Sequence, residues 1–90
     1  MNPYKDLEVT EEYIIREFSQ DIDPTELLWH RDDEDRTVEI LGETDWKYQL
    51  EDNLPTSINN PIFIPRGKYH RVIKGTGNLK VKIYKNEKIN

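Results

Sequence analysis

The feature that most limits the fold of this chain is a series of short segments in which apolar and polar residues alternate. Trp46, Tyr48 and Leu50 alternate with polar residues, as a strand with one buried face requires. Glycine, proline, asparagine and aspartate separate such segments and favour turns between them. Six strands are predicted, at residues 25–32, 37–41, 46–50, 62–64, 69–74 and 79–84. This spacing indicates an all-β fold, either an antiparallel sandwich or a small barrel.

The N-terminal part is expected to differ. Residues 10–20 are predicted to form a short helix, because a threonine at its start can cap it and Ile14 and Phe18 would share one face. Pro24 would end it, and residues 1–9 are expected to be irregular. The 90 residues therefore predict one domain. It would consist of a helical lead-in (1–24), the sheet region (25–85) and a polar tail (86–90).

Composition excludes several classes of protein. The net charge of −5 does not favour a nucleic-acid partner, and the basic residues gathered in 66–88 are interpreted as a solubilising face that discourages edge pairing. No apolar run approaches a membrane span, and the N-terminus lacks the apolar core of a signal peptide, so we expect a cytoplasmic protein without membrane contact. Cysteine is absent, so a metal would be held by imidazole, carboxylate, backbone oxygen or water.

Both histidines of the chain lie in segments that alternate like strands. His30 and Asp32 are two residues apart, so on a strand their side chains would leave the same face. If His70 faces them from another strand, the three form a two-histidine, one-carboxylate set. Such a set suits a divalent metal with open coordination positions. The alternative is a structural pair of histidines, hydrogen-bonded to Asp32 and without a metal.

The segment around His70 resembles a motif of the cupin superfamily. The second cupin motif runs Pro-x-Gly-x-x-His, and here Pro65, Gly67 and His70 match it in full. Physically, Gly67 can adopt the positive φ that a tight turn into the histidine strand needs, and Pro65 stiffens that turn.

The segment around His30 resembles the first cupin motif in part. His30 and Gly42 match, Asp32 stands in place of the second histidine, and Asp35 stands where cupins usually have glutamate. This departure resembles the His-x-Asp…His pattern of cupin-fold oxygenases that use Fe(II) and 2-oxoglutarate. The chain as a whole looks like small single-domain cupin-like proteins of bacteria and phages that have no assigned activity.

The resemblance implies a fold and a metal site. The fold would be a small cupin-like antiparallel barrel of the jelly-roll type, with about six strands and one N-terminal helix. Fe, Mn, Ni or Zn would lie at the mouth of this barrel, on His30, Asp32 and His70. A fourth ligand could be Glu39 or Asp35, although Glu39 does not share a face with the residues that look like core.

Aromatic residues near these segments have two readings each. Trp46 and Tyr48 could line a ligand pocket or could simply be core. Trp29 and Tyr69 have opposite parity to the histidines, so they are expected to face outward and to pack on the predicted helix or on a second subunit. Since the chain is small, exposed aromatic residues favour a homodimer.

Three arginines could pair with an anionic ligand: Arg36, Arg66 and Arg71. None has clear inward parity, which counts against a 2-oxoglutarate oxygenase. The leading hypothesis is a metal-binding cupin-like protein that could act on a small organic substrate. The alternative is a metal-free barrel that binds a small ligand or a protein and has no catalytic activity. A third, weaker reading is an epimerase-like cupin in which a histidine is the base.

Overall fold

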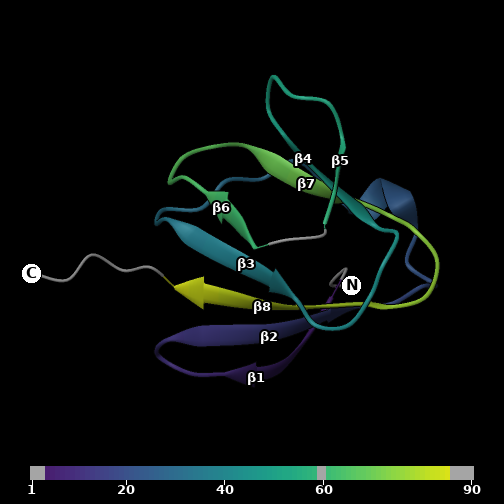
Figure 1. Ribbon diagram of the computed structural model, residues 1–90, viewed down its shortest axis with the longest axis horizontal. Helices are drawn as coiled ribbons and strands as arrows, with labels where there is room; N and C mark the ends of the chain where they lie inside the picture. Colours follow the sequence, from purple (N-terminus) through teal and green to yellow (C-terminus); the bar gives the residue numbers. More distant parts are fainter. Residues whose placement is uncertain (1–3, 59–60, 86–90) are drawn as a thin grey trace, which may run out of the picture.

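The protein consists of two antiparallel sheets (Figure 1). The computed structural model describes residues 4–58 and 61–85. A five-stranded sheet has the order β1-β2-β8-β3-β6, and a three-stranded sheet has the order β5-β4-β7. The strands are β1 (Lys5–Val9), β2 (Tyr13–Phe18), β3 (Arg36–Ile40), β4 (Lys47–Leu50), β5 (Thr56–Ser57), β6 (Ile62–Ile64), β7 (His70–Ile73) and β8 (Leu79–Lys85).

The predicted N-terminal helix is wrong, because residues 13–18 form strand β2 between β1 and β8. Ile14 and Phe18 are both buried, as expected, but they share a sheet face and not a helix face. A spacing of four residues fits both periods, since four is one helical turn and also two strand repeats. The expectation of an irregular start is also wrong, because β1 pairs with β2 along the edge of the sheet.

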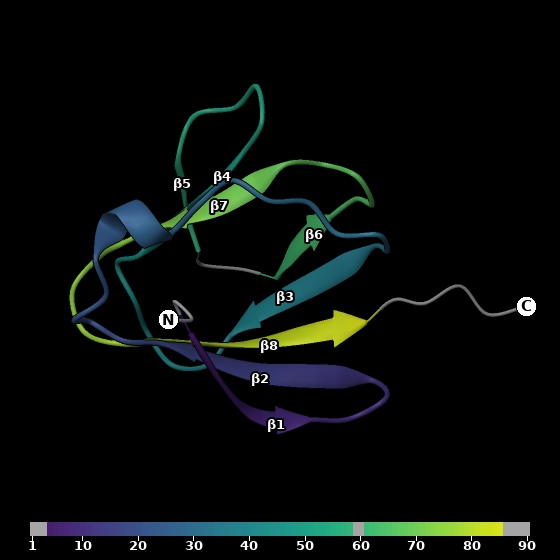
Figure 2. The same cartoon turned by 180° about the vertical axis from the view of Figure 1, so that it is seen from behind.

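The predicted strand at 25–32 is replaced by a 3₁₀ helix, Pro24–Glu26, and an irregular segment (Figure 2). The Asp23 carboxylate caps this helix by accepting from the Thr25 N–H at 3.0 Å. In the rest of the segment, the only β-type pairing within the described residues is an isolated bridge between His30 and His70. The predicted loop after β4 contains the short strand β5, and its residues 59–60 lie outside the described part of the chain.

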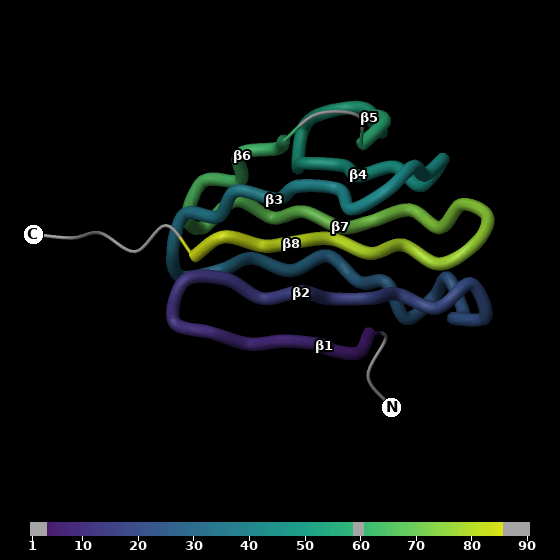
Figure 3. The backbone as a smooth tube through the Cα atoms, turned by 60° about the horizontal axis from the view of Figure 1, so that its bottom comes forward, coloured from purple at the N-terminus to yellow at the C-terminus, as the bar shows by residue number. Residues whose placement is uncertain are grey.

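The strands predicted in the remaining segments are confirmed as β3, β4, β6, β7 and β8. The described residues form more strands than the six expected, and their sheets do not close into a barrel. Figure 3 shows the three-stranded sheet lying against one face of the five-stranded sheet. The turn at 75–78 joins β7 in one sheet to β8 in the other, so it is a connection between the two sheets.

The core lies between these sheets. On β8, Leu79, Val81 and Ile83 are buried whereas the intervening lysines point away, which confirms the predicted alternation. Trp46 is fully buried, and its indole Nε1 donates to the Gly77 carbonyl at 3.0 Å, so its one polar atom is satisfied. No helix in the described ranges is long and apolar enough to cross a membrane.

Candidate metal centre

A tight turn precedes β7 and contacts the segment that carries His30 and Asp32. The Lys68 N–H donates to the Pro65 carbonyl at 3.1 Å, and Gly67 has a φ of +79°, as predicted from the motif. Glycine at the third position of such a turn is typical of type II geometry. The Gly67 N–H also donates to the Asp32 carbonyl at 2.9 Å. The turn therefore holds the backbone of Asp32 beside the start of β7.

Two further backbone hydrogen bonds complete this junction. The His30 N–H donates to the His70 carbonyl at 3.0 Å, and the His70 N–H donates to the His30 carbonyl at 2.8 Å. This reciprocal pair is the isolated antiparallel bridge. It explains why His30 and Asp32 face the same side, as predicted, although the segment is not a strand.

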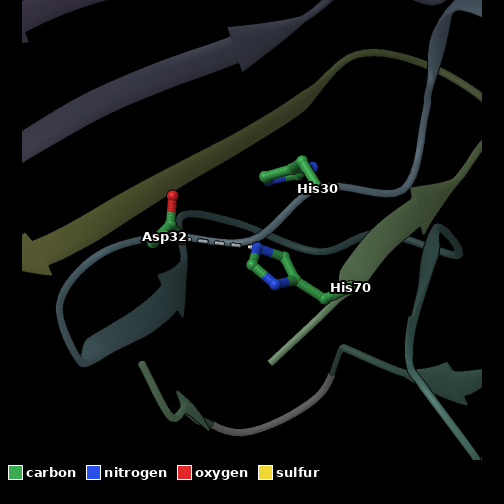
Figure 4. A group of neighbouring side chains, drawn as sticks. All are labelled: His30, Asp32 and His70. Carbon is green, nitrogen blue, oxygen red and sulfur yellow. Dashed lines mark ion pairs between the residues drawn. The ribbon is translucent and has the colours of Figure 1, made fainter. Parts of the chain in front are cut away.

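The structure brings His30, Asp32 and His70 together (Figure 4). One ligand atom from each lies within 4.8 Å of the others. His70 Nε2 and Asp32 Oδ2 are 3.4 Å apart, and the two imidazole ring centroids are 4.1 Å apart. Two atoms bound to the same tetrahedral metal at about 2.05 Å lie about 3.3 Å from each other. The spacing of His70 and Asp32 therefore fits a shared divalent ion.

Both imidazoles are oriented through their Nδ1 atoms. His70 Nδ1 lies 2.8 Å from the Lys68 carbonyl, and His30 Nδ1 lies 3.2 Å from the Leu28 carbonyl. A carbonyl only accepts, so each Nδ1 carries a proton, and in the neutral ring Nε2 then presents a lone pair. Histidines that bind metals are usually held in this way by a carbonyl or carboxylate. The donor set therefore fits a metal in its atoms and in its tautomers.

Electrostatics favour the metal-binding forms of His30 and Asp32. His30 has an edge open to solvent, yet the partial burial of its ring lowers its pKa, and the charge of His70 lowers it further. The pairing with His70 Nε2, a hydrogen bond when that nitrogen carries a proton, is the largest cause that lowers the pKa of Asp32, and the positive charge of Arg36 adds to it. A neutral imidazole and an ionised carboxylate are therefore favoured at neutral pH, which is what ligation requires.

The two candidates for a fourth ligand do not join this group. Asp35 lies in the turn before β3, where its carboxylate accepts from the Arg66 N–H at 2.8 Å. Glu39 lies in β3 on the face opposite Val38, and it accepts from the Tyr84 hydroxyl at 3.2 Å. Both carboxylates thus have other partners, and three protein ligands leave positions for water or substrate.

The three residues line a cavity of about 900 Å³ between the sheets. The residues that line it are mostly apolar, and Tyr48 is among them. Trp46 is not: it is fully buried in the core, which is the second of the two readings of its pattern. Leu27, which directly follows the 3₁₀ helix, is buried and also lines the cavity.

Arg36 and Arg71, for which no clear inward parity was expected, both line the cavity. Arg16, which was not predicted to contact a ligand, lines it too. Arg36 lies two residues before Val38 on the inner face of β3, and that spacing was the signal that could have identified it. It pairs with Glu34 at 3.2 Å, and Arg66 does not line the cavity.

The predicted outward aromatic residues do face away from the site. Trp29 and Tyr69 are each 41% exposed, and with the predicted helix absent each instead has an arginine over its ring. The Arg71 guanidinium lies 4.7 Å from the Trp29 ring centroid, and that of Arg31 lies 5.4 Å from the Tyr69 ring. These contacts cover part of each ring.

Comparison with known proteins supports the architecture. No family model matches the sequence. No curated protein matches it either. The structure is similar to that of an RmlC-like cupin family protein with a double-stranded β-helix fold from Methanocaldococcus jannaschii, with a TM-score of 0.63 and 17% identity over 91% of this chain and 76% of that one.

Two further solved structures have the same fold. A cupin domain from Bordetella pertussis gives a TM-score of 0.60 and 16% identity over 93% of this chain and 92% of that one. Hydroxypropylphosphonic acid epoxidase from S. wedmorenis gives 0.58 and 18% identity over 81% of this chain, which spans 41% of the epoxidase chain. The two-sheet arrangement is therefore the cupin double-stranded β-helix, as the motifs around His30 and His70 suggested.

Proposed function

We propose that this chain binds a divalent metal ion through His30, Asp32 and His70 and presents it to a small organic molecule in the adjacent cavity. One observation carries the proposal: a ring nitrogen from each imidazole and a carboxylate oxygen lie within 4.8 Å of one another, and a backbone carbonyl contacts each imidazole. A purely structural role would need only the contact between His70 and Asp32, whereas His30 also brings a ring nitrogen to this group.

The donor set narrows the choice of metal without fixing it. Two nitrogen ligands and one oxygen ligand suit Fe(II), Mn(II), Ni(II) or Zn(II), and the affinity order alone does not select among them. Such an ion supplies Lewis-acid chemistry to a bound substrate. The chain contributes two imidazoles, a carboxylate whose pKa is lowered and a mostly apolar cavity wall. That a protein of this fold is an epoxidase supports an enzymatic role.

Metal titration of protein made without a histidine tag tests this proposal. We expect Zn²⁺ or Co²⁺ to bind in a one-to-one ratio by isothermal titration calorimetry, and His70→Ala to abolish binding. A metal present at 100 times its dissociation constant should raise the free energy of unfolding by about 2.7 kcal/mol. The rival, a metal-free binding domain, predicts no bound metal and no change in melting temperature when a chelator is added.

Matched carboxylate variants make the test specific. Asp32→Asn should lower the affinity for the metal at least tenfold, since it removes the charge of a ligand but keeps the shape of the side chain. Glu39→Gln makes the same chemical change on the face of β3 that points away from the cavity, where Glu39 accepts from the Tyr84 hydroxyl. It should leave the affinity for the metal unchanged. Equal effects of the two substitutions would contradict the proposed ligand set.

The assembly state is also part of the proposal. Trp29, Tyr69 and Phe63 keep 41%, 41% and 55% of their surface exposed, which supports association of two copies. Sedimentation velocity should give a mass of twice 10.8 kDa. A monomer at micromolar concentration would contradict it without affecting the metal site.

A further inference from the structure

We propose that Arg36 binds the carboxylate of a small organic acid whose apolar body occupies the cavity. The inference rests on the proposed function insofar as this acid would be the molecule presented to the metal. The binding itself requires only Arg36 and the cavity walls, so it can be measured without a metal.

Arg36 has the placement that such a role needs. It lies in β3 on the face that Val38 turns toward the cavity, and both residues line the cavity. Its side chain is 19% exposed, so the guanidinium is largely withdrawn from bulk water. Arg36 and Asp32 line the same cavity, and the positive charge of Arg36 contributes to the lowered pKa of that carboxylate.

Arg36 also has donors to spare. A guanidinium carries five N–H donors. One terminal nitrogen of Arg36 contacts Glu34 at 3.2 Å, whereas its buried Nε has no hydrogen-bond partner among the described residues. A buried donor without a partner is uncommon in folded proteins and calls for an explanation. A small rotation of the guanidinium would offer Nε and a terminal nitrogen together to a ligand in the cavity.

The other two arginines of the cavity are already engaged. Arg16 donates to both oxygens of the Asp6 carboxylate, at 2.7 and 3.3 Å, and lies 3.7 Å from the ring centroid of Tyr4. Arg71 donates twice to the Gln49 amide oxygen, at 3.0 and 2.9 Å. Of the three, Arg36 is therefore the one that can accept a ligand without losing a complete pair of contacts.

The chemistry of the cavity selects an acid with an apolar body. The planar fork of arginine matches the two oxygens of a carboxylate, and an interaction with an ionised acceptor is stronger than one with a neutral group. Much of the remaining wall is aliphatic, contributed by both sheets and including Val38, Ile62, Ile64, Val72 and Val81. A volume of about 900 Å³ is ample for a small molecule.

Hexanoate and its neutral amide test this directly. We would titrate each into ¹⁵N-labelled, chelator-treated protein and follow amide shifts by NMR, since without metal the carboxylate cannot bind simply by ligating an ion. Hexanoate should bind saturably and shift the amides of Val38 and Ile64. Hexanamide has nearly the same size but no charge, and should bind at least tenfold more weakly.

Variants assign the effect to one side chain. Arg36→Gln should lower the affinity for hexanoate at least tenfold and leave the affinity for hexanamide unchanged. Lys82→Gln removes the same charge from the outer face of β8, where the ammonium lies between the Tyr13 and Tyr84 rings, and should leave hexanoate unchanged. If Arg36→Gln does not fold, the comparison of acid with amide in the unmodified protein still decides the matter.

Several results would overturn this inference. They are equal affinity for acid and amide, full hexanoate affinity in Arg36→Gln, an equal loss in Lys82→Gln, or no saturable binding of hexanoate. Because all of these are measured without metal, they are independent of the metal titration. A protein that binds Zn²⁺ but not hexanoate would keep the metal site and lose the acid site.

Discussion

Replacing Gly67 by alanine should weaken both the fold and the metal site, and replacing Gly77 should weaken only the fold. The two glycines form a matched pair: their φ values are +79° and +73°, and an added Cβ would meet no atom within 4 Å at either position. An alanine held at such a φ costs about 1–2 kcal/mol. In a domain of this size each kcal/mol lowers the melting temperature by about 4–8 °C.

The two positions differ in what they hold. The Gly67 N–H donates to the Asp32 carbonyl, and its turn leads directly into His70. The Gly77 carbonyl accepts from the Trp46 indole, far from the proposed ligands in the fold, and alanine keeps that carbonyl. If alanine relieves its strain by shifting the turn at 67, the Asp32 loop and His70 move apart, so we expect at least a tenfold loss of Zn²⁺ affinity in Gly67→Ala alone.

Urea denaturation of the chelated proteins would measure the first effect, and calorimetric titration with Zn²⁺ the second. Equal Zn²⁺ affinities in Gly67→Ala and Gly77→Ala would refute the argument that this turn positions the ligands. Unchanged stability in both variants would refute the argument from backbone strain.

Three further predictions concern stability. Since the pKa of His30 is below its ordinary value of 6.5, the unfolded chain takes up its proton first as pH falls, so the metal-free protein should lose stability as pH drops through 6.5, and His30→Gln should flatten that slope in urea titrations at pH 5–8. Gly75→Ala would place its Cβ 2.7 Å from the Trp46 backbone nitrogen, and should cost about 1–3 kcal/mol in the same assay. Leu79→Ala removes a fully buried side chain and should cost about 2–5 kcal/mol by thermal melting.

Alternation alone predicted most of the sheet. Segments such as β8 and β4 have one apolar face and one charged face, and no helix period fits them. The N-terminal strands were missed for two physical reasons. In β2, Ile14 and Phe18 fit both periods, and Arg16 between them hid the inward face. In β1 every residue is exposed at the sheet edge, so its sequence carries no burial pattern.

The shared orientation of His30 and Asp32 was predicted correctly, but the strand that was expected to produce it is absent. His30 and Asp32 do face one side, but a bridge to His70 and the turn at Gly67 orient them, not a strand. Such tertiary hydrogen bonds are not visible in the spacing of residues. For Arg36 the spacing was sufficient, since it shares its parity with Val38 on the inner face of β3.

The reciprocal bridge between residues 30 and 70 affects how the domain opens locally. Apart from this bridge, the segment before β3 pairs with neither sheet in the described part of the chain. The Gly67–Asp32 hydrogen bond and the buried Leu27 side chain are further attachments, so it can detach locally while the sheets stay intact. A divalent ion bound by both imidazoles would cross-link His30 to His70 and close a loop of forty residues. Amide hydrogen exchange at His30 and Gly67 would then slow on metal addition far more than exchange in the centre of β8.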